Sequence, residues 1–251
     1  MSNLKKAIKN PVKAIEIANR RYFQIGLTTK DPEVSFMKGW VYGSLKRERL
    51  DEVFSGIENT NYQIVKGFCR TDNMSMTLQE INVTMAILNF FKAKKIFEIG
   101  TFDGGTTVNL AANTPEDGIV YTADLPQDFD NNYKLNINGV SNNQSDPNNV
   151  GKQYRESDYK YKVKQILEDS AKIDFEQYDA PYDLFFIDGC HDYEYVKKDT
   201  ESALKHTKKG GVIIWHDYGM IKDVSTYIDE IKDKYDIRAI KGTRLAVYQV
   251  K

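Results

Sequence analysis

Two short runs of titratable residues in the last third of the chain have the types needed for metal or acid–base chemistry. Asp188 and His191 follow one apolar run, and His216 and Asp217 follow another. Carboxylate ligands suit Mg²⁺, while an imidazole tilts the choice toward Mn²⁺, Fe²⁺ or Zn²⁺, so Asp188, His216 and Asp217 could share one cation. The ordinary pKa of histidine lies near neutrality, so His191 could act as a general base. The alternative is that both aspartates cap helices and both histidines fill polar gaps.

A glycine-containing loop forms a second candidate site. The run KIFEIG (95–100) leads into TFDGGTT (101–107), where Gly100 and Gly104 allow a tight turn and a close backbone approach to a ligand. A dinucleotide site would need G-x-G-x-x-G, and a phosphate loop would need a lysine after the last glycine, and neither is present. The pattern favours a ligand bound through close backbone contact, unless the turn only lets a helix pack on a strand. The candidate cofactor residues here are Glu98, Gly100, Thr101, Gly104 and Thr106.

Two more acidic positions end predicted strands. Asp124 ends the run GIVYTAD (118–124), where a carboxylate can accept both ribose hydroxyls of a nucleotide. Asp169 and Ser170 end the next run, where a polar pair can hydrogen-bond an adenine edge. The alternatives are a turn or cap role for Asp124 and an N-cap role for Asp169, and the two roles of Asp169 can coexist.

The elements that must position these residues alternate between strands and helices. Such alternation predicts a parallel sheet with helices on both faces, and ligands of these sheets bind at the carboxyl ends of the strands. The fold class we expect is α/β: a Rossmann-like, seven-stranded, mostly parallel sheet with an antiparallel C-terminal hairpin. The expected strands are 95–100, 118–124, 161–169, 182–188, 211–215, 237–240 and 244–250, with helices at about 77–91, 107–112, 193–207 and 224–235.

Two segments fall outside this alternation. Residues 1–75 are expected to form an N-terminal helical extension before a domain at 76–251, with Asp31 to Glu33 as a helix start and helical spacing over 33–57. The extension would be a substrate cap or a homo-oligomer contact, and its first 21 residues either a packed helix or a basic amphipathic one. Its aromatic residues suit an acceptor pocket, a dimer contact or ordinary packing. The polar insertion 125–157 is too long for an ordinary connection, so it is a surface loop or a lid.

Composition narrows the classes of function. The formal net charge is −1, which gives no electrostatic argument for nucleic acid or an anionic membrane. The two cysteines, Cys69 and Cys190, form no disulfide framework, which favours a cytoplasmic setting. The N-terminus lacks the apolar region of a signal peptide, and no run is long enough for a transmembrane helix.

The motifs together resemble those of class I S-adenosylmethionine (SAM) methyltransferases. Glu98, Gly100 and Gly104 fit the first motif of that class, and residues from about 76 to 250 look like the family of macrocin and mycinamicin sugar O-methyltransferases. That family's pattern, I-D-G-x-H-x-Y and then G-G-x-I-x-x-x-D-Y, reads here as 187–193 and 210–218. The resemblance implies SAM as cofactor, Asp188 and Asp217 as magnesium ligands and His191 as base. His216 stands where those enzymes have an acidic residue, which puts the magnesium in question.

The expected function is therefore SAM-dependent O-methylation of a hydroxyl on a sugar or other small polyol, in glycan or natural-product biosynthesis. The acceptor would be held by Mg²⁺ or Mn²⁺, and His191 would take its proton. One rival is a metal-dependent hydroxylase or hydrolase that uses Asp188, His191, His216 and Asp217. Another is a SAM-binding module without turnover.

Overall fold

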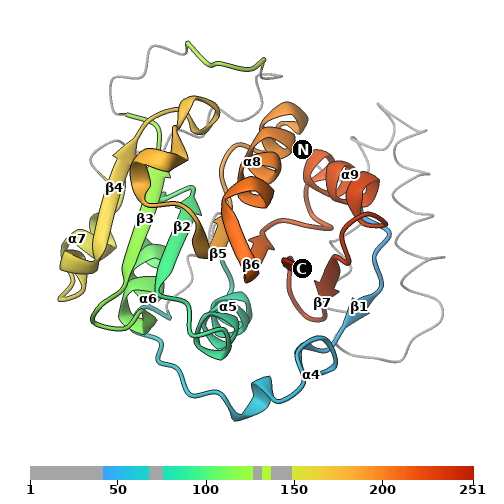
Figure 1. Ribbon diagram of the computed structural model, residues 1–251, viewed down its shortest axis with the longest axis horizontal. Helices are drawn as coiled ribbons and strands as arrows, with labels where there is room; N and C mark the ends of the chain where they lie inside the picture. The colour runs from blue at the N-terminus through green and yellow to red at the C-terminus, as the bar shows by residue number, and fades with distance from the viewer. Residues whose placement is uncertain (1–41, 68–75, 127–131, 137–148) are drawn as a thin grey trace, which may run out of the picture.

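The computed structural model describes residues 42–67, 76–126, 132–136 and 149–251. Its centre is an eight-stranded sheet in the order β1-β7-β8-β6-β5-β2-β3-β4, shown in Figure 1. The predicted helix start at 31–33 and the basic N-terminal segment lie outside the described residues. The strands are β1 (Arg47–Glu48), β2 (Lys95–Ile99), β3 (Ile119–Asp124), β4 (Val163–Leu167), β5 (Tyr182–Ile187), β6 (Thr207–Trp215), β7 (Arg238–Ile240) and β8 (Ala246–Gln249).

The sheet confirms the expected fold class. β4, β3, β2, β5 and β6 are parallel neighbours, while β8 runs antiparallel to both β6 and β7. The central strands are apolar on both faces because helices cover both sides of a parallel sheet. The strand count differs from the prediction, because β1 adds an eighth, edge strand that pairs in parallel with β7.

Helices form a layer on each face of the sheet (Figure 1), and a separate hydrophobic core lies between the sheet and each layer. On one side, α5 (Leu78–Phe90) and α6 (Gly105–Asn113) pack over one set of strand residues. On the other side, α8 (Tyr193–His206) and α9 (Lys222–Ile231) cover the alternate set. Neighbouring positions such as Ile96 and Phe97 therefore belong to different cores, although both are fully buried.

The segment before α5 differs from the predicted extension. Within 42–57 there is no continuous helix: β1 is followed by the one-turn α4 (Leu50–Val53) and the 3₁₀ turn η3 (Ile57–Asn59). The mixed spacing of apolar residues there reflects a chain that lies along the edge of the sheet. Arg47 explains part of the attachment, because its guanidinium donates to the backbone oxygens of Thr243, at 2.6 Å, and Tyr218, at 3.1 Å.

Local signals set several element boundaries correctly. The capping box at Thr77 and Glu80 opens α5, with the Thr77 hydroxyl accepting from the Glu80 N–H at 3.2 Å. α8 ends at His206 as expected, but β6 begins at Thr207 and not at Gly211. The register between β5 and β6 shifts there, so the Lys-Lys-Gly-Gly run bulges out of the pairing; its Gly210 has φ +78°. No helix among the described residues is long and apolar enough to cross a membrane.

The described parts of the insertion 125–157 attach to the carboxyl edge of the sheet. Near its end, the Gly151 N–H donates to the Phe102 carbonyl at 2.7 Å, just before α7 (Lys152–Arg155). Further back, the Lys134 N–H donates to an Asp169 carboxylate oxygen at 2.7 Å. Two separate parts of the insertion thus touch two different predicted cofactor motifs. Whether it opens and closes as a lid stays a prediction.

Candidate active site

The glycine loop turns sharply between β2 and α6 and lies against the next strand. Gly100 has φ +99°, and a Cβ placed there would lie 2.1 Å from the Asp188 carbonyl oxygen. Gly104, at φ +84°, is the N-cap residue of α6. Only glycine fits at position 100, because a side chain would collide with the backbone of the neighbouring site. The loop predicted to meet the cofactor therefore adjoins the residue predicted to meet the acceptor.

Three of the predicted cofactor residues, Glu98, Thr101 and Thr106, make side-chain contacts with other parts of the protein. Glu98 is fully buried, and its Oε2 accepts hydrogen bonds from Thr107 and Thr122 at 2.5 and 2.6 Å. The Thr101 hydroxyl is 2.7 Å from that of Thr122. The Thr106 hydroxyl contacts the sulfur of Met76 at 3.2 Å. Glu98 and Thr101 thus support the loop from inside the protein, and the surface open to a ligand is mainly the loop backbone.

Asp124 lies beside this loop, as expected of a ribose-binding residue. Its Oδ2 accepts from the Phe102 N–H and its Oδ1 from the Leu125 N–H, both at 2.8 Å. Burial raises the pKa of Asp124 above its usual value, although these backbone N–H groups act in the opposite direction. The side chain is only half-buried, so the carboxylate is accessible to a ligand hydroxyl.

The surroundings of Asp169 and Ser170 bear on the two roles that the sequence left open, a helix N-cap and a contact with an adenine edge. Asp169 is the N-cap of the turn η5 (Ser170–Lys172), accepting from the Ala171 N–H at 3.0 Å. Its other oxygen accepts from the Tyr195 hydroxyl at 2.9 Å and from the backbone of the insertion, and the residue is 2% exposed. The half-buried Ser170 is therefore the better placed of the two for an adenine edge.

The acid–histidine cluster assembles at the ends of β5 and β6. His191 Nε2 lies 3.4 Å from Asp217 Oδ2 and 3.6 Å from Asp188 Oδ1. Ligand atoms of Asp188, His191 and Asp217 all lie within 4.8 Å of one another, close enough to share a cation. The His191 ring is 36% exposed, but its Nε2 is buried and makes no hydrogen bond within the described part of the chain. That nitrogen faces two carboxylates, and in the neutral ring it can accept a proton or a metal.

His216 lies beside both aspartates, as the sequence suggested, with Nδ1 3.5 Å from Asp217 Oδ1, but it also contacts a third carboxylate. Its Nδ1 lies 2.9 Å from Asp188 Oδ1, and its Nε2 lies 3.3 Å from Glu80 Oε2. Burial acts to lower the pKa of His216, but the adjacent carboxylates outweigh it and raise the pKa well above 6.5. With both ring nitrogens turned toward carboxylates, His216 acts as a buried cation. The geometry favours His191 over His216 as the histidine that would accompany Asp188 and Asp217 on a metal.

The protonation states within the cluster follow from these contacts. Burial would raise the pKa of Asp188, but His216 and His191 outweigh it and lower that pKa to about 2. For His191 burial acts to lower the pKa, and the nearby Asp188 and Asp217 carboxylates raise it above 6.5 overall. The cluster therefore holds an ionised Asp188 beside a histidine whose pKa is raised above its ordinary value.

Sequence reasoning missed Arg244 and recognised Glu80 only as a helix cap. Arg244 Nη1 donates to Asp217 Oδ1 at 2.9 Å, and its Nε and Nη2 grip the Glu80 carboxylate at 2.9 and 2.8 Å. The two residues are separated by 164 positions, so no local spacing could have paired them. The only available signal was a charged residue in a short turn between two apolar strands.

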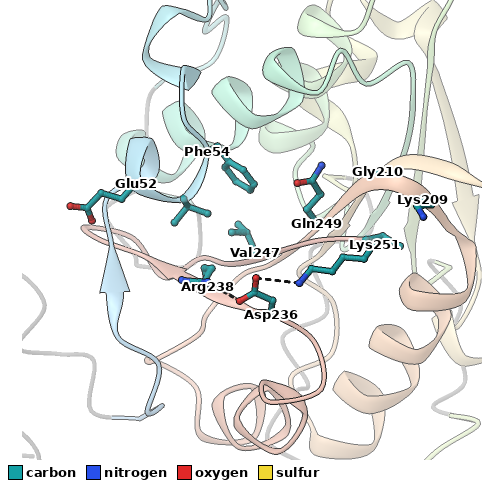
Figure 2. A pocket seen from close by; sticks show the side chains of 11 residues that line it. Glu52, Phe54, Lys209, Gly210, Asp236, Arg238, Val247, Gln249 and Lys251 are labelled. Atoms are coloured by element: carbon teal, nitrogen blue, oxygen red, sulfur yellow. Dashed lines mark hydrogen bonds and ion pairs between the residues drawn. The ribbon is translucent and has the colours of Figure 1, made fainter.

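A hollow of about 460 Å³ lies at the amino end of β6, away from this cluster (Figure 2). It is bordered by Phe54 and Val247 and by charged side chains that pair with one another. Asp236 accepts from Arg238 at 2.8 Å and lies 3.5 Å from the Lys251 ammonium. Because none of the predicted site residues lines it, the hollow is not the active site.

Comparison with known proteins fits this geometry. Residues 97–218 match a family model described as a methyltransferase domain, and the match spans the glycine loop, Asp124, Asp169 and the acid–histidine cluster. Residues 97–218 of the chain therefore carry a methyltransferase domain. A comparison with curated proteins finds no match. The narrower resemblance to the macrocin-type sugar enzymes stays a prediction.

Solved structures share the fold of this methyltransferase at low identity. The O-methyltransferase TomG of Streptomyces achromogenes, in complex with SAM, is 15% identical with a TM-score of 0.54, over 93% of this chain and 96% of its own. An O-methyltransferase of Bacillus cereus, in complex with S-adenosylhomocysteine (SAH), is 17% identical with a TM-score of 0.51, over 92% and 95%. An SAH-bound methyltransferase of Podospora anserina is 14% identical with a TM-score of 0.54, over 90% and 98%.

Proposed function

We propose that the methyltransferase moves the methyl group of SAM to a hydroxyl oxygen of a sugar or other small polyol, with His191 as general base. The observation that carries this proposal is the contact between the two halves of the site. Gly100 of the cofactor loop lies against the backbone of Asp188, whose side chain adjoins His191. A methyl donor on the loop would thus lie beside a group able to take a proton.

The chemistry asked of these residues is modest, because the sulfonium already activates the methyl group. A lone pair of the acceptor oxygen attacks the methyl carbon while the electrons of the carbon–sulfur bond return to sulfur, leaving neutral SAH. The hydroxyl proton passes to His191 Nε2, which faces the Asp217 and Asp188 carboxylates at 3.4 and 3.6 Å, so the imidazolium that forms is stabilised by opposite charge. The protein's contribution is to align oxygen, carbon and sulfur and to receive that proton.

A divalent cation would fit this site on the chemistry of its donors. Asp188, Asp217 and His191 offer two carboxylates and an imidazole within reach of one another, a set that suits Mn²⁺ and, with waters, Mg²⁺. A bound cation would supply charge that lowers the pKa of the acceptor hydroxyl. If His191 were one of the metal ligands, another group would have to accept the proton of the acceptor hydroxyl. If Asp188 and Asp217 alone held the metal, His191 would be available as the base.

The proposal also includes the kind of acceptor, the role of the N-terminal residues and the location of the protein. Asp188 and His191 are half-buried, at 24% and 36% exposed, so their side chains are accessible to a small-molecule or glycan acceptor. We propose that residues 1–75 contribute an acceptor cap or homo-oligomer contact to the methyltransferase domain at 76–251, although strand β1 within them belongs to the sheet of that domain. With two cysteines in the whole chain, we propose a cytoplasmic location.

The rival functions find less support. A non-haem iron enzyme would want two histidines and a carboxylate on the metal, but His216 has both nitrogens directed at carboxylates. A SAM-binding module without turnover would have no use for an imidazole that faces two carboxylates after β5, the strand next to that of the glycine loop.

The decisive experiment joins cofactor binding to acceptor choice. Cofactor-stripped protein is titrated calorimetrically with SAH, with and without Mg²⁺ or Mn²⁺, and we expect micromolar binding. Methyl transfer from isotope-labelled SAM is then measured on a panel of methyl glycosides, with simple phenols and primary amines as controls. Transfer to glycosides supports the proposal. Failure to bind SAH would remove the cofactor assignment, and transfer to amines alone would remove the hydroxyl acceptor.

A further inference from the structure

Behind the acid–histidine cluster lies a second layer of charge that the proposed chemistry does not use. Glu80 is 0% exposed and Arg244 is 5% exposed, so neither reaches solvent or an acceptor. The Glu80 carboxylate nevertheless accepts hydrogen bonds from the Thr77 N–H at 2.7 Å and from the Arg244 N–H at 2.7 Å. It also accepts the two guanidinium bonds of Arg244 described above.

A helix cap alone does not explain a buried negative charge. Glutamine serves the same capping position as glutamate, without the cost of burying a carboxylate, which amounts to several kcal/mol. Burial acts to raise the pKa of Glu80, but the hydrogen bonds from His216 and Arg244 outweigh it and hold that pKa well below its usual range. His216 and Arg244 therefore keep the Glu80 carboxylate ionised, and that charge in turn holds His216 and Arg244 in place.

Arg244 connects this buried carboxylate to the cluster. Its planar fork binds Glu80 through two nitrogens and presents the third to Asp217 Oδ1, so one rigid group fixes both carboxylates. Such support also fixes the backbone of Asp217, which has φ +60°, in the left-handed region that is uncommon outside glycine, asparagine and aspartate. Strained conformations of this kind persist where the surrounding contacts determine them.

His216 receives the second connection. Its ring is held between Asp188 in front and Glu80 behind, which fixes the plane of the imidazole. The arrangement resembles the outer carboxylates that orient histidine ligands in metal sites, where removing the outer partner reduces affinity or activity about 10- to 100-fold. Glu80 thus reaches Asp188 through His216 and Asp217 through Arg244.

We infer that Glu80 and Arg244 are positioning residues, which orient Asp188, Asp217 and through them His191 for methyl transfer without touching cofactor or acceptor. This inference rests on the proposed function of the site. It assigns a catalytic consequence to the start of α5 and to the β7–β8 hairpin, two elements that carry no candidate catalytic residue. It also explains why the turn after β7 contains an arginine that is buried.

The test compares Glu80→Gln with Thr77→Ala. Glu80→Gln keeps a capping residue and removes the charge, while Thr77→Ala weakens the same cap and leaves the charges in place. We expect Glu80→Gln to lower kcat about 10- to 100-fold on the best glycoside of the panel, with the SAH Kd within about threefold of wild type. Thr77→Ala should keep wild-type kcat and lose only stability.

A readout that needs no acceptor separates this inference from the proposed function. The chain has three histidines, so the ring signals of isotope-labelled histidine can be assigned by substitution. In Glu80→Gln the His216 and His191 signals should shift, while those of His206, which stacks on Phe175 elsewhere, should not. Arg244→Lys keeps a cation but not the fork, and should shift the same signals and lower kcat likewise.

The outcomes are distinct. Unchanged His216 and His191 signals in folded Glu80→Gln, or an equal loss of kcat in Thr77→Ala, would overturn the inference. Arg244→Lys provides the same comparison if Glu80→Gln does not fold, and wild-type kcat in that variant would also overturn it. If the histidine signals shift as expected in Glu80→Gln but the wild-type protein methylates no acceptor, the positioning role would stand and the proposed function would be wrong.

Discussion

Gly100 and Asp188 are in direct backbone contact: a methyl group on the Cα of Gly100 would lie 2.1 Å from the Asp188 carbonyl oxygen. The contact is also held by a hydrogen bond from the Asp188 N–H to the Ile99 carbonyl at 2.8 Å. Because both residues end neighbouring parallel strands, any movement of the cofactor loop is transmitted to the residue that begins the acid–histidine cluster.

Gly100→Ala should therefore damage both halves of the site. The alanine meets backbone, which cannot move aside as a side chain can, so we expect SAH binding to weaken at least tenfold and methyl transfer to be lost. Gly56→Ala is the matched control, because Gly56 also has a positive φ, +89°, but has no atom within 4 Å of the added carbon. It should cost only about 1 kcal/mol of stability. Equal SAH affinity in the two variants would contradict the packing argument.

His191→Gln should lower kcat about 10²- to 10⁴-fold and leave the SAH Kd unchanged, because the base acts only on the acceptor. The pH dependence gives a second measurement. The nearby carboxylates raise the pKa of His191 above 6.5, and only the neutral ring can accept a proton. The wild-type rate should therefore rise with pH through a midpoint above 6.5, and that rise should be absent in His191→Gln.

The control for this variant is His206→Gln. His206 lies at the end of α8, where its ring pairs with Glu176 at 3.5 Å and not with the cluster. It should keep the wild-type rate and pH profile. A wild-type rate in His191→Gln would instead assign the proton to another acceptor.

Asp124→Asn should weaken SAH binding about 10- to 100-fold, the usual effect of losing a charged hydrogen-bond acceptor. Asparagine can still accept the Phe102 N–H that the aspartate holds at 2.8 Å, so the glycine loop should keep its shape. Asp117→Asn is the control, since Asp117 is exposed. Calorimetry distinguishes the two, and unchanged affinity in Asp124→Asn would exclude a role in ribose binding.

The position of the candidate cofactor residues at the carboxyl ends of strands could be predicted because it depends on local pattern. Apolar runs such as YDLFFI mark strands that are buried on both faces, and the residue after each run falls at the carboxyl edge whatever the tertiary detail. Asp124, Asp169 and Asp188 were found in this way. The capping box at Thr77 and Glu80 was equally local and equally readable.

What could not be predicted depends on contacts between distant segments. Both histidines lie beside the two aspartates, and the preference for His191 as a metal ligand depends on Glu80, which contacts His216 from a helix 136 positions earlier. Strand β1 contains two residues, too few for any periodicity, and exists because β7 offers it a free edge. The irregular start of β6 similarly reflects pairing with β5 and not the turn propensity of its glycines.

Glu98→Gln should alter how stability depends on pH. Burial raises the pKa of Glu98 to about 8, despite the opposing hydrogen bonds from Thr107 and Thr122. The unfolded chain releases this proton near pH 4.5, so between about pH 4.5 and pH 8 the folded state binds more protons. The free energy of unfolding of the wild type should therefore fall as pH rises through that interval, whereas glutamine contributes no such dependence. Relative to wild type, the variant should gain on the order of 3 kcal/mol from pH 5 to pH 8.

Denaturant unfolding at pH 5, 6.5 and 8 measures this difference directly. Glu58→Gln is the matched control, because Glu58 is exposed and should show the wild-type dependence. In Glu98→Gln the amide oxygen can still accept from both threonine hydroxyls, so SAH binding at pH 6.5 should change little. A parallel pH dependence in wild type and Glu98→Gln would mean that Glu98 is ionised beneath the loop. It would then act as a buried negative charge facing the sulfonium side of the cofactor site, and not as a neutral support.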